Sequence, residues 1–411
     1  MGVVSKRRGA RLNRYMTRFG DGLATGLDLA AAAEEAVRQA TRSLDGRADL
    51  LCVFVSGSDP AEIEQAARRA MAVSDAKTVL GCSAQGVIGG GRGVERETKD
   101  IGEVGAVAAW AAILPGARLI PFELETLRAE DRLVVVGMPE AAPDDVVGIL
   151  LADPHSFPVD AFVERSEEVL PGLPLVGGLA GGGEGESRLF VDDKIIESGA
   201  VGVVIGGPVE ATTLLSQGAR PIGPLMTVTS AEQNILFELA GSPALDKLEE
   251  VVAGLTGSER ELAAEGLLIG VAMDEYADEH EQGDFLVRGV VGVDPDTGAL
   301  AVGDVVQTGQ TVRFQVRDAG AADHDLASLV RGFDVGPVEG ALLFSCNGRG
   351  RAMFESSDHD IRALDGFGSV GGFFADGEIG PVAGRNHVHG FTASILAFGA
   401  RREAGAGARQ T

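Results

Sequence analysis

The sequence contains few cysteines and few of the aromatic residues that line wet binding surfaces. Its three cysteines, Cys52, Cys82 and Cys346, are widely spaced, and none belongs to a CxxC pair. This usage argues against a disulfide framework and indicates a reducing compartment. There are 2 tyrosines and 1 tryptophan against 17 phenylalanines. Because phenylalanine mostly fills cores, the composition does not favour a surface that stacks on nucleic-acid bases.

Long apolar runs and a secretory signal are also missing. The longest apolar run, 104–114, ends at Pro115 and is well short of the roughly 18 residues that a membrane-spanning helix needs. The first 20 residues carry six Lys and Arg residues, but no apolar segment follows them as it would in a secretory signal. We therefore expect a cytoplasmic protein without a membrane span.

Acidic residues and glycine are the abundant types. The chain has 61 Asp and Glu residues against 35 Lys and Arg residues, a formal net charge of −26. Such a charge argues against a nucleic-acid partner, since phosphate contact needs clustered cations. The 59 glycines occur in a chain that is 45% hydrophobic. We therefore expect them at tight turns and close backbone approaches of a folded protein.

The order of the expected elements indicates the fold class. The length of 411 residues predicts two or three domains. The chain opens with a helix over 28–44, a strand over 50–55, a helix over 61–72 and a strand over 78–82. Asp59 is the expected N-cap of the second helix, and Pro60 its first residue. Many short strands follow, with few helices and no repeat at a fixed period. This pattern predicts an α+β fold with mixed, largely antiparallel sheets and flanking helices.

A domain boundary is expected near residue 240, after the Gly/Pro-rich segment 218–224. Four parts are predicted: a basic flexible tail over 1–20, a domain over 21–239, a domain over 240–398 and a flexible tail over 399–411. Apolar periodicity predicts further helices over 159–170, 230–240 and 243–253. Asp192 and Asp193 are expected to form the turn of a β-hairpin.

The chain contains no Walker A motif, GxSxG elbow or HExxH motif. The most suggestive single residue is Cys346, which ends an apolar strand and precedes Asn347, Gly348 and Arg349. A nearby guanidinium would lower the pKa of the thiol, and a histidine would complete a nucleophile–base pair. The alternative is an inert thiol packed at the end of a buried strand.

His387 and His389 form an HxH pair, which would place both imidazoles on one face of a strand. Asp376 or Glu378 would be a third metal ligand. A single HxH pair is a weak signal, so we expect structural histidines and neither a metal nor a cofactor.

Three glycine clusters, over 81–89, 176–181 and 372–381, remain. Glycines at strand ends allow backbone N–H groups to approach a ligand, or they form tight turns. Both readings remain open for these clusters.

These clusters also carry a resemblance to a known family. The segments "GCSAQGVIGGG", "LVGGLAGGG", "FSCNGRG" and "GGFFADGEIGPVAGRNHVHGFT" occur in this order, and the chain resembles a FIST-domain protein over about 28–398. The resemblance implies a FIST N-terminal domain followed by a FIST C-terminal domain. It also implies an intracellular sensory role in bacterial signal transduction. Such proteins are proposed to bind small ligands, and amino acids are one suggested class. A separate signalling protein such as a histidine kinase would be the partner.

The resemblance brings no catalytic residues with it. The positions that match the family's motifs are Gly81, Ser83, Gly86, Gly177, Gly178, Cys346, Asn347, Gly348, Arg349, Gly377, Glu378, Gly380 and His389. We hypothesise that Arg349 and Glu378 converge on one pocket, where Arg349 clamps a ligand carboxylate and Glu378 takes its ammonium group. The alternative is that the two side chains form a salt bridge with each other.

The sequence thus predicts a cytoplasmic, non-enzymatic protein that binds a small metabolite. The first alternative is a thiol-dependent hydrolase or transferase that uses Cys346 with His387 or His389. The second alternative is a scaffold that binds another protein.

Overall fold

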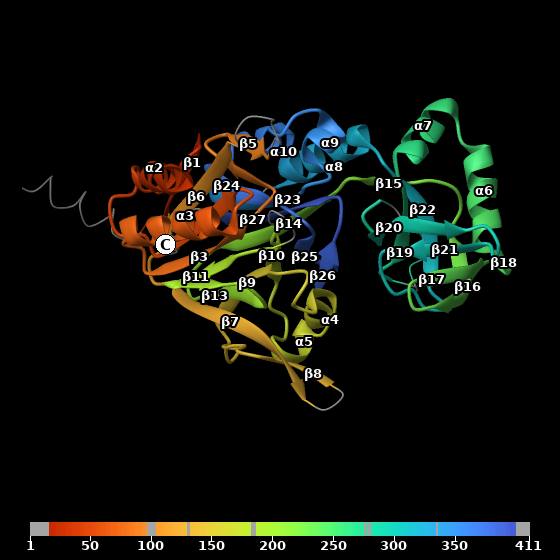
Figure 1. Cartoon of the computed structure of the whole chain (residues 1–411), viewed down its shortest axis with the longest axis horizontal. Coiled ribbons are helices and arrows are strands. Elements are labelled where there is room, and N and C mark those ends of the chain that lie inside the picture. The colour runs from red at the N-terminus through yellow and green to blue at the C-terminus, as the bar shows by residue number, and fades with distance from the viewer. Residues whose placement is uncertain are drawn as a thin grey trace, which may run out of the picture.

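The computed structural model describes residues 16–96, 104–129, 132–181, 186–274, 277, 280, 282–333 and 336–399. It consists of a large part and a small barrel that lie side by side (Figure 1). The large part, here called the body, takes residues 16–217 and 319–399. The barrel takes residues 219–317 and is inserted into the body between two of its strands.

The body contains three sheets of six, seven and six strands. Sheet I has the order β1 (Arg18–Gly26), β6 (Gly105–Ile113), β2 (Leu50–Ser56), β3 (Thr78–Ser83), β11 (Leu189–Val191) and β12 (Lys194–Ile196). Sheet II has the order β26 (Arg385–His389), β25 (Glu378–Val382), β10 (Leu175–Leu179), β9 (Asp145–Ala152), β13 (Ala200–Gly206), β7 (Arg118–Ala129) and β8 (Arg132–Val136). Sheet III has the order β14 (Ala211–Gln217), β27 (Thr392–Gly399), β23 (Val338–Cys346), β24 (Ser369–Ala375), β4 (Gly86–Gly89) and β5 (Arg92–Glu95).

The three sheets repeat one strand plan. Each contains a parallel pair, namely β2 with β3, β9 with β10 and β23 with β24. An antiparallel strand from later in the same stretch of chain, β6, β13 or β27, lies on one side of the pair. A hairpin from a different stretch of chain lies on the other side: β11–β12 in sheet I, β25–β26 in sheet II and β4–β5 in sheet III. The body is therefore a threefold repeat that exchanges its hairpins cyclically.

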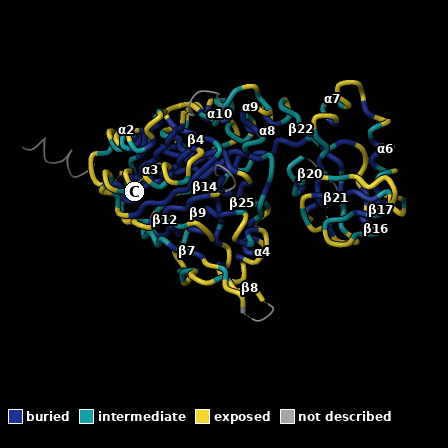
Figure 2. Tube along the Cα trace, viewed as in Figure 1, coloured by how far each residue is buried: buried dark blue, intermediate teal, exposed yellow. Residues whose placement is uncertain are grey.

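A single apolar core lies between the three sheets. It includes Phe54 of sheet I, Ile149 of sheet II and Phe344 of sheet III, all almost completely buried. Trp110 is fully buried in this core, and its indole N–H donates to the Ser369 carbonyl oxygen at 3.0 Å. Figure 2 shows that burial follows the strands, whereas exposed residues lie on the outer helices and loops.

Helices cover the outer faces of the sheets. Sheet I packs against α2 (Leu29–Thr41) and α3 (Pro60–Val73), sheet II against α4 (Val159–Glu164) and α5 (Ser166–Val169), and sheet III against α8 (Ala319–Gly332) and α10 (His359–Ala363). The short helix α9 (Gly350–Phe354) follows β23. The Asp59 side chain accepts from the Ala61 N–H and caps α3, with Pro60 in its first turn, as the sequence predicts. Within the described residues, no helix is long and apolar enough to cross a membrane.

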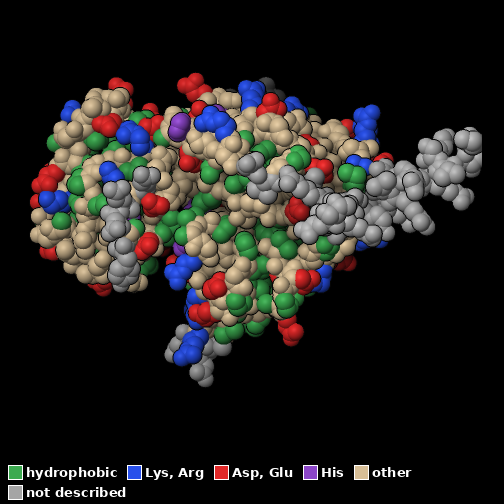
Figure 3. All heavy atoms as spheres, turned by 180° about the vertical axis from the view of Figure 1, so that it is seen from behind, with side chains coloured by type: hydrophobic (Ala, Val, Ile, Leu, Met, Phe, Trp, Pro, Cys, Tyr) green, Lys and Arg blue, Asp and Glu red, His purple; other side chains and the backbone are tan. Residues whose placement is uncertain are grey.

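The barrel is closed by pairing between β22 and β19. Its strand order is β15 (Ala219–Pro221), β22 (Thr311–Arg317), β16 (Met226–Glu232), β17 (Ile235–Leu239), β21 (Ala299–Val302), β20 (Phe285–Asp294) and β19 (Leu267–Ala272). The short strand β18 (Ser242–Pro243) pairs with β17, and the helices α6 (Ala244–Gly254) and α7 (Gly257–Glu265) complete the apolar interior. Acidic and basic side chains are scattered over the reverse face of both parts (Figure 3).

The predicted α+β class with mixed, largely antiparallel sheets is confirmed. The Asp192 turn is also confirmed, with a positive φ of 51°. The helix predicted over 230–240 is wrong, because this segment forms the β16–β17 hairpin with Gln233 in its turn at a φ of 53°. Its apolar residues fit either period, and burial inside the barrel selects the strand. The helix predicted over 159–170 is interrupted at Arg165 and forms α4 and α5.

The end of the predicted basic tail and the predicted domain boundary both fall within the described residues. β1 begins at Arg18, inside the segment assigned to the basic tail. The boundary predicted at residues 239 and 240 falls within the barrel, between β17 and α6. Residues 1–15 and 400–411 of the predicted tails lie outside the described residues.

The close approach of the parallel strands requires glycine at one equivalent position in each sheet. Gly81, Gly177 and Gly372 each pair with a residue of the neighbouring parallel strand. A Cβ atom would lie 2.0, 1.9 and 1.8 Å from the carbonyl oxygen of that residue. We expect Gly177→Ala to lower the free energy of unfolding by about 3 kcal/mol or more, measured by urea unfolding, because both backbones must move apart.

The matched control is Gly254→Ala in α6, where a Cβ atom meets nothing within 4 Å. It should leave stability unchanged or raise it by up to about 1 kcal/mol, because alanine favours helix. Equal effects of the two substitutions would contradict the close-approach argument.

Candidate functional site

The turns that follow β3, β10 and β24 meet at the carboxyl ends of the parallel strands. The Gly181 N–H donates to the Ser83 carbonyl oxygen at 3.1 Å, which joins the turns of sheets I and II. The Cβ position of Gly181 lies 3.0 Å from Asp376 Oδ2 and 3.1 Å from Gln85 Cγ. The three glycine clusters therefore lie beside one another, although they are far apart in sequence. Ligands often bind at the carboxyl ends of parallel strands.

Polar side chains from all three sheets surround this meeting point. The Asn347 side-chain amide donates to Asp376 Oδ1, and the backbone N–H of Arg96 donates to the backbone carbonyl oxygen of Gln85 at 3.0 Å. Loss of hydration raises the pKa of Asp376, against the opposing effects of His155 and Asn347. Part of the Asp376 side chain still reaches solvent. Gln85 belongs to the first glycine cluster, whereas no sequence pattern singled out Arg96 or His155, which follow β5 and β9.

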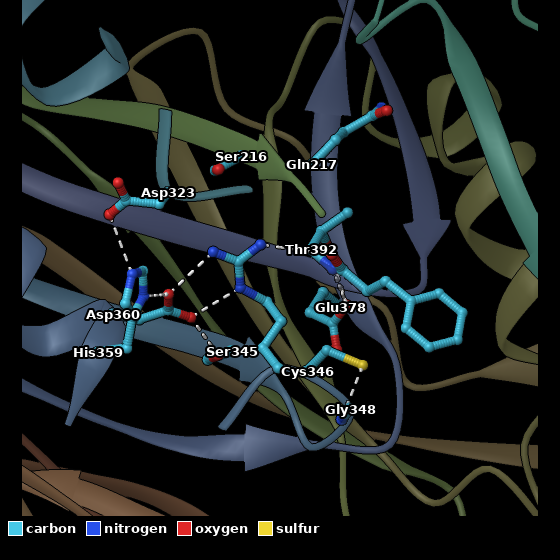
Figure 4. Close-up of polar contacts among 12 residues, drawn as sticks. Ser216, Gln217, Asp323, Ser345, Cys346, Gly348, His359, Asp360, Glu378 and Thr392 are labelled. Atoms are coloured by element: carbon cyan, nitrogen blue, oxygen red, sulfur yellow. Dashed lines mark hydrogen bonds and ion pairs between the residues drawn. The ribbon is translucent and has the colours of Figure 1, made fainter. Parts of the chain in front are cut away.

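A second, buried cluster lies directly beside these turns, where β23, β25 and β27 come together (Figure 4). Cys346 ends β23 and is 7% exposed, whereas Glu378 begins β25 and is fully buried. The backbone N–H and the hydroxyl of Thr392 donate to Glu378 Oε2 at 3.1 and 2.8 Å. The other oxygen, Oε1, forms no hydrogen bond within the described part of the chain. The thiol of Cys346 lies next to this carboxyl group.

The environment keeps both groups of this cluster protonated at neutral pH. Burial raises the pKa of Glu378 to about 8, against the opposing hydrogen bonds from Thr392. Burial and the neighbouring carboxyl group also raise the pKa of the Cys346 thiol. Because Oε2 already accepts two hydrogen bonds, the proton of Glu378 belongs on Oε1. The site therefore presents a neutral O–H donor beside a neutral thiol.

Arg349 does not pair with Glu378. Its Nε and Nη2 atoms donate to Oδ2 and Oδ1 of Asp360, each at 2.8 Å. Ser345 and His359 also bind Asp360, and both residues of the ion pair are buried. Burial alone would raise the pKa of Asp360, but the Arg349 charge holds it well below its usual range. The salt bridge between Arg349 and Glu378 is therefore not formed, and the guanidinium is already engaged within the protein.

The other predicted site residues occupy two regions. Gly178 and His389 pair with Glu378 from the two neighbouring strands, and His389 Nε2 lies 3.0 Å from the Gly380 carbonyl oxygen. Gly81, Gly86 and Gly177 are strand residues in close backbone contact. The Ser83 hydroxyl is buried and accepts from the Arg188 N–H at 2.8 Å. The structure thus groups Gly178, Cys346 and His389 around Glu378, with Asn347 beside Asp376.

His387 and His389 show the environment of structural histidines. Burial lowers the pKa of His387 to about 4 and that of His389 to about 3, so both rings are neutral at physiological pH. Their ring centroids are 6.0 Å apart. Among the described residues, no group of three or more His, Cys, Asp or Glu side chains is arranged to hold a metal ion.

Comparison with known proteins places this chain in a family. The FIST N domain model matches residues 49–242, and the FIST C domain model matches residues 244–381. A protein of Mycobacterium tuberculosis, described only as uncharacterized, is 41% identical over 392 residues, which cover 93% of this chain and 99% of that protein. An uncharacterized protein of Mycobacterium bovis is also 41% identical, over 93% of this chain and 98% of its own length. The chain belongs to the FIST-domain family, as its motifs indicate.

The junction of the two domain models, at residues 242–244, lies inside the barrel, at β18 and the first residue of α6. Strands of both matched regions share sheets II and III. The two FIST models therefore divide one interlocked body and its barrel rather than two separate units.

Removing Arg349 from its buried ion pair should be strongly destabilising. Arg349→Met leaves the Asp360 carboxylate buried without its cation, and we expect a loss of about 3–5 kcal/mol in the free energy of unfolding. The double substitution Arg349→Met with Asp360→Leu should recover part of this loss, measured by chemical denaturation. The control is Arg38→Met, which removes an exposed pair with Glu35 and should change little. A near-neutral effect of Arg349→Met would contradict the assigned pairing.

The raised pKa of Glu378 predicts a defined dependence of stability on pH. The carboxyl group keeps its proton in the folded protein up to about pH 8 and releases it near pH 4.5 in the unfolded chain. Its contribution to stability is therefore complete below about pH 4.5 and is lost as pH rises through 8. Glutamine has no such proton, so Glu378→Gln should gain about 2–5 kcal/mol relative to the wild type between pH 5 and 9.

Urea unfolding at several pH values measures this difference. Glu250→Gln, at a side chain that is 66% exposed, is the matched control and should follow the wild-type pH profile. A constant difference between Glu378→Gln and the wild type across this range would show that Glu378 is ionised throughout.

Proposed function

We propose that this FIST-domain protein is a non-catalytic sensor that binds a small molecule where β23, β25 and β27 meet. The observation that carries the proposal is the Oε1 atom of Glu378, a fully buried oxygen that makes no well-formed hydrogen bond in the described structure and lies beside the Cys346 thiol. A buried polar group that lacks a partner costs about 1–3 kcal/mol. Each such group in a native structure therefore needs an explanation, and a functional role is one of them.

The threefold repeat supports a functional reason for Glu378. The equivalent position is Leu189 in sheet I and Val87 in sheet III, because each lies opposite the residue that follows the equivalent glycine. Both of these side chains are apolar and fully buried. The fold therefore accepts an apolar residue here, and the carboxyl group in sheet II is not needed for stability.

The chemistry of the site favours a ligand with a hydrogen-bond acceptor. A ligand carboxylate or carbonyl oxygen would accept the Oε1–H of Glu378, and a hydrogen bond to a carboxylate is the stronger of the two. Asp376, two residues earlier and partly exposed, would take an ammonium group. Amino acids are therefore the first ligands to test. The roles of the two acidic residues differ from the sequence hypothesis, because Glu378 is neutral.

Phe391 forms the outer wall of this region. Its φ of 61° is unusual for a residue with a bulky side chain, and such strain is often found at functional sites. Gly348 lies against it, with a Cβ position 3.1 Å from the ring and 3.5 Å from Cys346 Sγ. A ligand that reaches Glu378 would have to move this ring.

Signalling belongs to the same proposal. Ring movement at Phe391 would reach the barrel, because Phe391 packs against Ala219, Phe285 and Val287, and Arg317 lies over its ring at 5.5 Å. A separate cytoplasmic signalling protein, such as a histidine kinase, would then respond to the bound state.

A thermal-shift screen with amino acids and small carboxylic acids tests the proposal. Saturation at about 100 times the dissociation constant should add about 2.7 kcal/mol to the free energy of unfolding. Glu378→Gln keeps a neutral donor and should retain most of the shift, whereas Glu378→Leu should lose it while remaining folded.

A flat response of the wild type across the panel, or a full shift in Glu378→Leu, would overturn the proposal.

Iodoacetamide labelling distinguishes the alternative of a thiol-dependent enzyme. The raised pKa of Cys346 predicts slow labelling at neutral pH. Fast labelling would favour thiol chemistry.

A further inference from the structure

One end of sheet II extends away from the body as a two-stranded ribbon. β13 pairs with residues 118–124 of β7, whereas β8 pairs with residues 125–129. These last residues of β7 and the whole of β8 are here called the ribbon, which projects from the lower edge of the body (Figure 1). β8 is the last strand of sheet II, so its outer edge presents backbone groups that no other described strand pairs.

The ribbon carries an unusual concentration of exposed aliphatic side chains. Leu127, Leu133, Val134 and Val136 are 49%, 58%, 42% and 37% exposed. Val169 of α5, 51% exposed, lies with Leu133 on a groove of about 270 Å³ beside the ribbon. Figure 3 shows hydrophobic side chains gathered on the reverse face next to the ribbon. An exposed apolar surface of this kind usually marks an interaction site.

Several other outer strands of the sheets carry charged residues, although β14 has none. Lys194 lies in β12, Arg385 in β26, and Arg92 and Glu95 in β5. β8 carries a charge at its first residue, Arg132, and none between residues 133 and 136. Natural proteins protect open sheet edges with charges, prolines or bulges. Beyond Arg132 the β8 edge has none of these protections, so it is open to pairing with another strand.

We propose that β8 is a dimer interface, in which two copies of this chain pair antiparallel through their β8 edges. An antiparallel pair centred on Val134 places this residue opposite Val134 of the partner subunit, and Leu133 opposite Val135 of the partner subunit. Every central pair is then aliphatic, and such cross-strand pairs stabilise a sheet. The two ribbons become one four-stranded sheet, which satisfies the minimum of three strands that an independent sheet needs.

The charge of the chain also favours this site for a second copy. A net charge of −26 opposes close approach of two copies over most of their surface. The uncharged run at residues 133–136 is a place where a twofold contact brings no like charges together. Strands of five residues bury less than the 1,200 Å² or so of a stable interface. The dimer should therefore be weak and depend on concentration, with a dissociation constant on the order of 10 µM.

Sedimentation velocity over about 1 to 100 µM tests the proposal with the full-length protein. The wild type should shift from monomer to dimer in this range. V134E places two carboxylates opposite each other and should remain monomeric, and V134K should do the same for two ammonium groups. An equimolar mixture of V134E and V134K should restore the dimer, because opposite charges then face each other across the twofold axis.

The matched control is V291E, at a valine that is 67% exposed on β20 of the barrel. It should dimerise like the wild type, and thermal melting should show that all variants are folded. A wild type that stays monomeric to about 100 µM would overturn the proposal and leave the surface to a different protein. Dimerisation of V134E alone, or a mixture that stays monomeric, would also overturn it.

Discussion

The exchange of hairpins among the three sheets is the constraint on which the body depends. Each parallel pair is completed by a hairpin from a different part of the chain, so no sheet forms from one stretch of sequence alone. Sheet III needs β4 and β5 from before residue 96 together with β23, β24 and β27 from after residue 337. The core between the sheets therefore forms only when the whole body has assembled. Long-range pairing of this kind makes folding slow and cooperative.

The same exchange positions the candidate site. The chain leaves each parallel pair at its carboxyl end in order to reach the neighbouring sheet, so the three departing turns meet. Glycine is required before each turn because the paired carbonyl oxygen comes within 2.0 Å of a Cβ position. At the position equivalent to Glu378, sheets I and III carry the buried apolar residues Leu189 and Val87. The residue in sheet II is Glu378, which distinguishes this position from its equivalents.

Local patterns predicted the elements well where short-range chemistry decides them. The Asp59 cap, the β2–α3–β3 unit and the Asp192 turn all follow from neighbouring residues. The threefold repeat was not predicted, because α2, β8 and the barrel occupy equivalent connections and differ in length. The helix expected over 230–240 failed for a related reason. Its apolar spacing fits both periods, and only closure of the barrel decides between them.

At the candidate site, too, local sequence did not predict the side-chain contacts or the burial that set the charge of each group. Cys346 and Glu378 lie close enough to Arg349 to influence its pKa, but the motifs did not show which groups each residue contacts. Asp360 lies 11 positions after Arg349 in a short helix, and nothing in the local sequence marks it as the partner. Burial also could not be read from the sequence, and burial decides the charge of Glu378.

The neutral state of Glu378, in place of the expected negative charge, changes what the site can recognise. An ionised Glu378 would attract an ammonium group, whereas a protonated Glu378 offers one hydrogen to an acceptor and leaves its other oxygen with Thr392. A ligand that brings a carboxylate next to this proton would further favour the protonated state, because a second negative charge in a buried site opposes ionisation. Binding and protonation of Glu378 would then support each other. The carboxyl group whose burial costs stability is thus the group whose protonation state a ligand would fix.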